Sequence, residues 1–264
     1  MSSARDGLRL AVGTFTAVRV PSPSSVDAAT VRTALLLVPV VGAAVGGAGG
    51  AVLEAVRVAT HHSVAGTWLS AVAGIATVVA LSRALHVDGL ADTADGLGSG
   101  RPAEDALAVM RRSDIGPFGV VTVVLVLLLQ IGAAAESIGR GTGWLGLLVA
   151  VTAGRTAVVW ACRRGVPPAR TDGLGRGFTG ALSTGTCVVL TAVVALASAG
   201  AGWLDDDRSW WLSLRGAVAV GVAALVAIAV VQRCTRRLGG VTGDVMGAVV
   251  ELGTTAALLC FALV

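Results

Sequence analysis

The sequence predicts an all-α polytopic integral membrane protein, a helical bundle with about seven transmembrane helices that form one domain over residues 1–264. Of the 264 residues, 55% are hydrophobic and only 14% are charged, against roughly 25% charged residues in a typical soluble domain. Apolar runs of about 20 residues recur along the chain, and each is long enough to cross a bilayer. Because these runs are continuously apolar, without the period-2 alternation of an outer-membrane barrel, we expect helices.

The elements follow in order along the chain. Residues 4–19 form a short apolar run interrupted by Arg9 and Arg19, which favours an interfacial helix within a cytoplasmic or interfacial segment 1–33 over a cleaved signal peptide. The abundant glycines of the later runs suit close packing of membrane helices. Seven apolar runs predict the spans, near 34–54, 66–86, 117–138, 145–162, 182–202, 212–232 and 245–263.

The distribution of arginine predicts the orientation. All basic residues are arginine, and one side of the membrane receives most of them, in segments 1–33, 87–116, 163–181 and 233–244. The opposite side has at most Arg57, Arg140, Arg208 and Arg215, together with the acidic run at 205–207. Because basic residues concentrate in cytoplasmic loops, we expect the N-terminus and the long polar loops in the cytoplasm, with the protein in the plasma (inner) membrane.

The composition and charge of the chain limit the classes of binding partner that we expect. The net charge is +4, and no basic block is interleaved with aromatic residues, so nucleic acid is not an expected partner. The four cysteines form no CxxC pair and lie in or beside apolar runs, which predicts buried free thiols. Membrane lipid and small-molecule substrates are the expected partners, and a homo-oligomer stays open.

Three aspartates carry the clearest chemical signal. Asp88, Asp92 and Asp95 lie in the stretch 85–96, at the end of the second apolar run. On a helix with about 100° per residue these positions share one face. Three like charges near lipid are costly to hold, so we expect a hard divalent cation such as Mg²⁺, shared with substrate phosphate, to neutralise them. The alternative is a solvated helix end.

Several arginines are candidates for binding phosphate. Arg111 and Arg112 precede Asp114 in a turn before the third span, where they either hold phosphate oxygens or only anchor the orientation. Arg155 lies inside the fourth span and needs an anionic partner, which is a substrate phosphate, one of the aspartates, or a structural acid such as Glu136.

The last span and the loop before it add further candidates. Asp244 and Glu251 lie seven residues apart and share a helix face, which suits a second acidic set or contact with a substrate hydroxyl; as an alternative, Asp244 is an acid that favours the helix N-terminus. The Gly-rich loop 171–178, which contains Arg176, could cradle phosphate through backbone N–H groups. His86 should point away from the acidic face and is expected to be structural. These residue types together suit phosphoryl or nucleotidyl transfer.

These motifs resemble a known family. The stretch 86–96 is similar to the H-x-D-G-L-A-D-x-x-D-G block of the cobalamin synthase family, the adenosylcobinamide-GDP ribazoletransferases or cobalamin 5′-phosphate synthases. Further blocks agree in order, at residues 15–21, 39–42, 110–119, 173–180 and 239–252. The resemblance therefore spans essentially the whole chain.

The resemblance implies a late step of cobalamin biosynthesis. Adenosylcobinamide-GDP would donate its cobinamide-phosphate moiety to α-ribazole or α-ribazole 5′-phosphate, with Mg²⁺ required and GMP released. Asp88 and Asp92 would bind Mg²⁺ on the pyrophosphate, and Asp95 would complete the metal shell or act as base. Phosphate oxygens would be held by arginines, and substrate or a second metal by the acids of the last span. The arginines are Arg112, Arg155 and Arg176, and the acids are Asp244 and Glu251.

One block departs from the family pattern, and two other protein classes compete. The turn 111–114 exchanges the usual acid and base about Ser113, which leaves the roles of Arg112 and Asp114 open. A CDP-alcohol phosphotransferase would share the start of its motif with residues 92–96, but its later spaced aspartates are absent. A cation transporter would place acids near mid-membrane, whereas here they cluster at one side.

Overall fold

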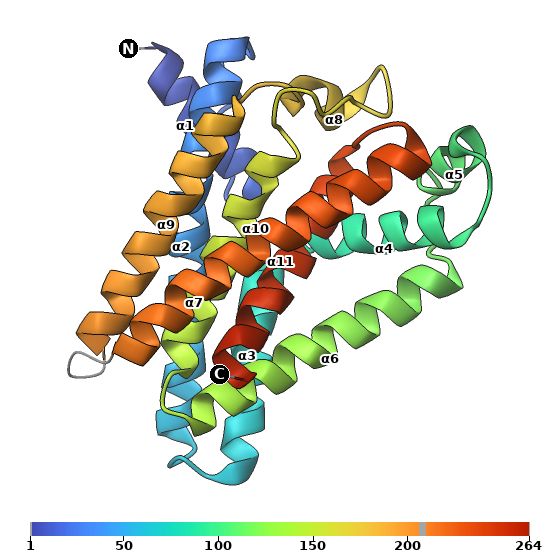
Figure 1. Ribbon diagram of the computed structural model, residues 1–264. Helices are drawn as coiled ribbons and strands as arrows, with labels where there is room; N and C mark the ends of the chain where they lie inside the picture. The colour runs from blue at the N-terminus through green and yellow to red at the C-terminus, as the bar shows by residue number, and fades with distance from the viewer. Residues whose placement is uncertain (1, 206–209, 264) are drawn as a thin grey trace.

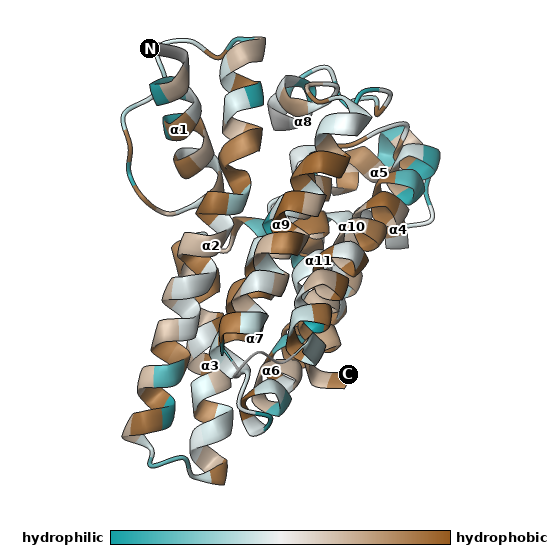
Figure 2. Cartoon of the chain, turned by 60° about the vertical axis from the view of Figure 1, so that its left-hand side comes forward, coloured by the Kyte–Doolittle hydropathy of each residue, from teal (hydrophilic) through white to brown (hydrophobic). Residues whose placement is uncertain are grey.

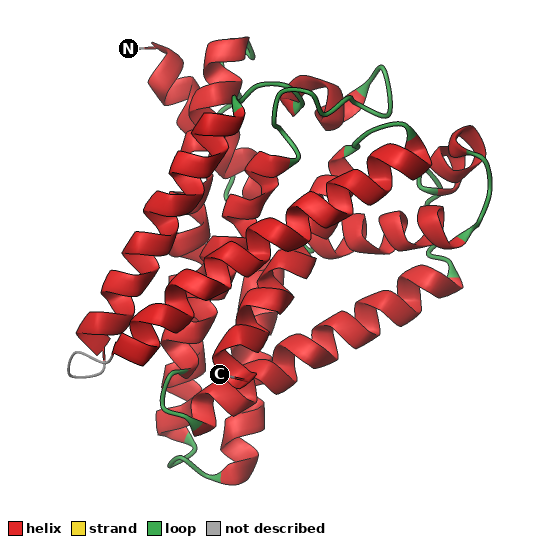
Figure 3. Ribbon diagram, in the orientation of Figure 1, coloured by secondary structure: helices red, strands yellow, loops and turns green. Residues whose placement is uncertain are grey.

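The computed structural model describes residues 2–205 and 210–263, and over these residues it contains helices and no strand (Figure 3). Seven helices are long and apolar enough to cross a membrane, so the predicted fold class is confirmed. They are α2 (Ala28–Ala59), α3 (Val64–Leu81), α6 (Pro117–Gly139), α7 with the following 3-10 turn η1 (Gly143–Trp160), α9 (Thr184–Asp205), α10 (Trp210–Leu238) and α11 (Gly243–Leu263). Figure 1 shows their arrangement.

The first span is longer at both ends than the apolar run 34–54 indicated. α2 begins after Asp27, whose side chain accepts a hydrogen bond of 2.8 Å from the Thr30 N–H and so caps the helix. Its opposite end continues to Ala59, past Arg57. Polar residues at both ends extend the helix beyond the apolar part, which hydropathy alone cannot locate.

Glycines let α2 and α7 pack with their backbones in contact. A Cβ atom built on Gly42, Gly46 or Gly50 would lie 3.0, 2.9 and 2.9 Å from backbone atoms of Thr152, Leu148 and Trp144. The spacing of four residues places these glycines on one face of α2, so they form the close helix–helix contact expected of small residues in membranes.

The second predicted span, 66–86, is wrong at its end. α3 stops at Leu81, and Arg83 and Ala84 adopt left-handed backbone conformations with φ of 55° and 54°. The aspartate stretch then forms a separate helix, α4 (Leu85–Gly98), which runs across the bundle in Figure 1 rather than along it. The predicted helical conformation of the stretch is correct, but it does not continue the span.

Three short helices gather at the same end of the bundle as α4. They are α1 (Ser2–Phe15), which corresponds to the predicted interfacial helix 4–19, and the unpredicted α5 (Ala103–Val109) and α8 (Gly173–Phe178). We call this end the aspartate end. In Figure 2 the hydrophilic colour concentrates at the ends of the bundle and the spans are mostly hydrophobic. Of the acidic run at 205–207, only Asp205 is described, and Arg208 also lies outside the described residues.

Two backbone bridges fix the loop 161–183 at the aspartate end. Leu182 pairs with Arg163, and Val241 pairs with Pro168. The second bridge is made by hydrogen bonds of 3.0 Å from the Ala169 N–H to the Val241 carbonyl and from the Val241 N–H to the Pro167 carbonyl. The loop is therefore held against the turn that starts α11.

Candidate functional site

α4 presents its three aspartates at different depths. Asp88 is exposed, Asp92 is half-buried and Asp95 is buried. The i, i+4, i+7 spacing keeps them on one side of the helix as predicted. The side chains therefore meet three different environments, which their identical chemistry in the sequence does not reveal.

The Asp95 carboxylate holds the beginning of α6. Its Oδ2 accepts a hydrogen bond of 2.7 Å from the Gly116 N–H, and its Oδ1 accepts one of 2.9 Å from the Gly119 N–H. These N–H groups belong to the unpaired donors at a helix N-terminus, where a negative charge is also favoured by the helix dipole. Asp95 thus has a structural use, and its predicted metal or base role stays a prediction.

Two glycines bring α4 and α11 into contact. A Cβ atom on Gly89 would lie 2.7 Å from the carbonyl oxygen and 2.9 Å from the Cα of Asp244, and one on Gly247 would lie 3.1 Å from the His86 carbonyl oxygen. No larger residue fits at Gly89 without moving a backbone. This crossing brings the acidic face of α4 to the first turn of α11, which joins Asp92 with Asp244.

The pKa of Asp92 reflects the charges of the neighbouring acids. Burial, followed by the charges of Asp244, Asp88 and Asp95, raises the pKa of Asp92 to about 7, and only Arg170 opposes the shift. A nearby cation would favour the ionised carboxylate. Within residues 2–205 and 210–263, however, no group of three or more His, Cys, Asp or Glu side chains is arranged so that it could hold a metal ion.

Two adjoining pockets open beside the cluster and share Gly243 and Asp244 in their walls. The first has a volume of about 160 Å³, and Asp88, His86 and Phe178 are among its lining residues. The second, of about 220 Å³, is lined by Arg111 and Arg170 and by Gly173 and Gly175, among other residues. The acids thus stand between one pocket with aromatic walls and one with basic walls.

Arg170 is the site residue that sequence reasoning missed. Its Nη1 lies 3.6 Å from the Asp244 Oδ2, its Nη2 donates to the Leu107 carbonyl at 2.8 Å, and its buried Nε has no partner among the described atoms. In the sequence it is one of many arginines in a polar loop. Its place beside Asp244 follows from the bridge between that loop and Val241.

The predicted arginines at the surface lie around this second pocket or beyond it. Arg111 pairs with Asp172 at 2.9 Å and not with Asp114. Arg176 is exposed and donates to the Thr171 carbonyl at 2.7 Å. Arg112 is exposed, and neither pocket includes it. Arg111 and the glycines of the loop are therefore better placed for phosphate than Arg112.

Arg155 and Glu251 lie in a buried polar cluster instead of the pockets. Arg155 is only 1% exposed, and its Nη2 donates to the Ser82 hydroxyl at 3.1 Å. Glu251 is 6% exposed and accepts a hydrogen bond of 2.9 Å from the Gln130 amide. The alternative partner Glu136 is excluded for Arg155, because Glu136 pairs with Arg140 at 3.1 Å. The positions of Arg155 and Glu251 give no support to their predicted substrate contacts.

His86 lies between the first pocket and the buried Arg155. It lines the first pocket, contrary to the expectation that it points away from the acids, and its buried Nδ1 has no hydrogen-bond partner in the described part of the chain. Burial and the nearby charge of Arg155 lower the pKa of His86 to about 3. The ring is therefore neutral and able to accept or donate a hydrogen bond.

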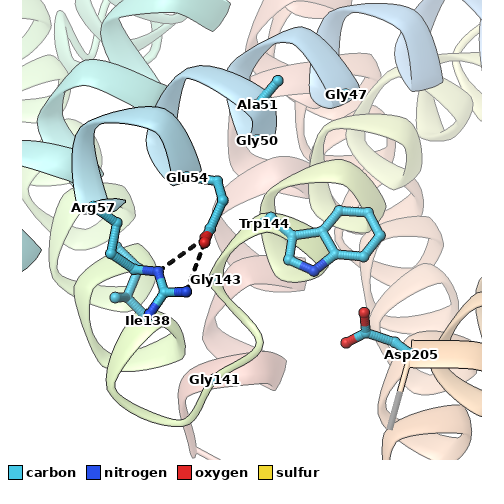
Figure 4. Close-up of a pocket in the computed structure, with 10 residues that line it drawn as sticks. All are labelled: Gly47, Gly50, Ala51, Glu54, Arg57, Ile138, Gly141, Gly143, Trp144 and Asp205. Atoms are coloured by element: carbon cyan, nitrogen blue, oxygen red, sulfur yellow. Dashed lines mark hydrogen bonds and ion pairs between the residues drawn. The ribbon is translucent and has the colours of Figure 1, made fainter. Parts of the chain in front are cut away.

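A larger cavity, of about 590 Å³, lies at the opposite end of the bundle (Figure 4). Its wall contains the ion pair of Glu54 with Arg57, at 2.6 Å, and the side chains of Trp144 and Asp205. None of the predicted site residues lines it. Because it lies apart from the α4 acids and their basic neighbours, this cavity is not the candidate site.

Known proteins are similar to this chain over nearly all of its length. Residues 7–262 match the family profile described as cobalamin-5-phosphate synthase. A protein of Frankia casuarinae named adenosylcobinamide-GDP ribazoletransferase is 37% identical over 97% of this chain and 94% of its own length. A protein of the same name from Nocardioides sp. is 39% identical over 98% of this chain and 99% of its own length. No solved structure shows a significant match.

Proposed function

The chain belongs to the cobalamin-5-phosphate synthase family, and on that premise we propose how its residues carry out the reaction. The protein is an adenosylcobinamide-GDP ribazoletransferase, which transfers the adenosylcobinamide-phosphate moiety to α-ribazole or its 5′-phosphate and releases GMP. In this reaction a ribose hydroxyl forms a bond to the phosphorus that carries cobinamide, and the pyrophosphate bond to GMP breaks. The hydroxyl proton must pass to a base.

The observation that supports the site is the pair of adjoining pockets that share Asp244. Arg111, Arg170, Gly173 and Gly175 line the second pocket, and the proposal has this pocket bind the pyrophosphate of the donor through the two guanidinium groups and the backbone of the glycines. Arginine and backbone N–H groups are the usual partners of phosphate oxygens. In this arrangement the scissile bond lies next to Asp244, at the boundary between the two pockets. Asp92 stands behind that boundary, close enough to Asp244 for the two charges to interact.

The residues present fit a Mg²⁺ ion that is shared with the substrate. Mg²⁺ in phosphate chemistry commonly uses one or two carboxylates together with substrate phosphates and water, so the proposal needs only two protein ligands and not the group of three that the described residues lack. Asp92 and Asp244 would hold the ion, which when bound neutralises charge on the phosphate oxygens. Asp95 is left out of this set, because both its oxygens hold α6.

Asp88 is the proposed proton acceptor. It is the exposed member of the cluster and lines the first pocket. A carboxylate at this position meets a hydroxyl that enters from the first pocket towards phosphate in the second. General-base catalysis requires this hydrogen-bond reach before any other property.

We propose that the protein lies in the plasma (inner) membrane, with its aspartate end in the cytoplasm. The proposal rests on the excess of arginine in the segments at that end. Both substrates would then enter from the cytoplasm without crossing the bilayer. Contacts with lipid and the state of oligomerisation stay predictions.

The test is GMP release by the purified full-length protein supplied with adenosylcobinamide-GDP, α-ribazole and Mg²⁺. We expect turnover that stops when EDTA removes the divalent ion and returns when Mg²⁺ is added in excess. Turnover that persists in EDTA would contradict the metal assignment. Turnover of a CDP-activated lipid with release of CMP, in place of GMP release, would contradict the reaction itself.

A further inference from the structure

The pocket of about 160 Å³ has a largely apolar wall, which is unusual beside a site that binds phosphate groups. Phe15 from α1, Phe178 from α8 and Met246 from α11 line it, and they are 5%, 4% and 8% exposed. The ring of Phe15 lies 5.9 Å from the ring of His86 at an interplanar angle of 38°. Apolar and aromatic groups from four helices thus converge on a small space.

The size and chemistry of this pocket select a flat ring system. Pockets for drug-sized ligands begin at roughly 300 Å³, so this one accommodates a ring system and not a whole nucleotide or a corrin. Phenylalanine faces stack on planar bases, and methionine adapts to an irregular apolar surface. No arginine lines the pocket, which sets it apart from its neighbour.

Resting on the proposed function, we propose that this pocket holds the base of the acceptor nucleoside. The base of α-ribazole is a methylated benzimidazole, which is planar, bicyclic and largely apolar, and it is the same whether or not the ribose carries a 5′-phosphate. The polar groups of the pocket agree with such a ligand. His86 lines the pocket, and its buried Nδ1 has no hydrogen-bond partner in the described part of the chain, so a rotation of this ring would offer a hydrogen bond to the one free ring nitrogen of the base.

The position of the pocket explains how the acceptor would be oriented. Asp88 and Asp244 belong to the same wall as the rings, so a base held against Phe15 and Phe178 leaves its ribose at the acids. Asp244 also borders the basic pocket. The acceptor hydroxyl is therefore presented towards the phosphate from the side opposite to the arginines.

Phe178→Ala tests the proposal by separating the two substrates. Loss of one stacking partner should raise the KM for α-ribazole by roughly 5- to 100-fold, while the KM for adenosylcobinamide-GDP stays within about twofold. The matched control is Phe118→Ala, since Phe118 is 52% exposed and lies outside the pocket. This control should leave both KM values unchanged.

Met246→Ala gives a readout that misfolding cannot imitate. The enlarged pocket should raise the kcat/KM for an acceptor with a bulkier tricyclic base relative to that for α-ribazole. Unchanged acceptor preference in Met246→Ala, together with an unchanged KM for α-ribazole in Phe178→Ala, would overturn the proposal. A rise in the KM for the donor alone would assign the pocket to guanine and overturn it as well.

These failures differ from failure of the proposed function. If the wild-type protein releases GMP with α-ribazole but the pocket variants do not alter acceptor kinetics, only the base site is wrong. If the wild-type protein releases no GMP with any acceptor, the reaction itself is wrong.

Discussion

Asp95 and Asp92 lie three residues apart on one helix and face different surroundings. Asp95 is buried against two N–H groups of α6, whereas Asp92 meets Asp244 and Arg170. The sequence predicts the shared face correctly, because helical periodicity fixes direction. It cannot predict depth, because depth depends on which helices pack above that face.

Replacing Asp95 should therefore affect stability first. Asp95→Ala leaves the Gly116 and Gly119 N–H groups without their acceptor, and we expect a loss of about 1–3 kcal/mol in the free energy of unfolding. Asp95→Asn keeps one oxygen acceptor and should lose less. Thermal unfolding in detergent measures both. Full stability of Asp95→Ala with no activity would instead favour the metal or base role.

Replacing Asp92 should affect catalysis with little change in folding. A metal ion contributes several kcal/mol to the stabilisation of transferring phosphate, so Asp92→Asn should lower kcat/KM by about 100-fold or more. Asp105→Asn, at an exposed position of α5, is the control and should keep full activity. An active Asp92→Asn enzyme would remove Asp92 from the metal set.

At the scale of elements, the crossing of α4 and α11 determines the site. Gly89 and Gly247 allow the two helices to touch, and the left-handed residues Arg83 and Ala84 turn α4 out of line with α3. The seven spans could be predicted from hydropathy because lipid requires long apolar helices. The turn could not, since neither Arg83 nor Ala84 carries the glycine or proline signal that usually marks such a break.

Gly89→Ala tests the crossing. Its Cβ would lie 2.7 Å from the Asp244 carbonyl oxygen, so the helices must separate and shift Asp92 relative to Asp244. A misplacement of about 1 Å can cost about 100-fold in rate, and we expect a loss of this order in kcat/KM. Gly132→Ala on α6 is the matched control, because no atom lies within 4 Å of its Cβ position. Equal activity of the two variants would contradict a tight crossing.

At the scale of the molecule, the residues of the candidate site lie at one end of the helical bundle. The described acids of the cluster, the basic pocket and the bridged loop all lie at the aspartate end. Hydropathy and arginine counts predicted this grouping, because both follow from the bilayer. The assembly of the pocket walls from α1, α4, α8 and α11 could not be predicted. Phe15 and Phe178 lie in two of the blocks that resemble the family, but nothing in those blocks indicates that the two rings line one pocket.

The proposed orientation can be measured by thiol labelling of intact cells whose outer membrane is absent or has been removed, so that the reagent reaches the plasma membrane. Ser113→Cys marks the aspartate end and Val64→Cys the opposite end, and both positions are exposed. In a Cys260→Ala background, a membrane-impermeant maleimide should label Val64→Cys directly and Ser113→Cys only after permeabilisation. The native Cys162, Cys187 and Cys234 are buried and should stay unlabelled. The reverse pattern would invert the topology.

The shared wall residue Asp244 has a consequence for biosynthesis of the protein. The α4 acids are synthesised early, but their partner is in the first turn of α11, the last of the described helices. The loop that carries Arg170 is paired through Pro168 with Val241 in the turn before α11, and Gly175 of α8 packs against the same turn. A chain that is still being inserted therefore has the α4 acids without complete walls for either pocket, because both walls include Gly243 and Asp244. The docking of α11 against α4 completes the site.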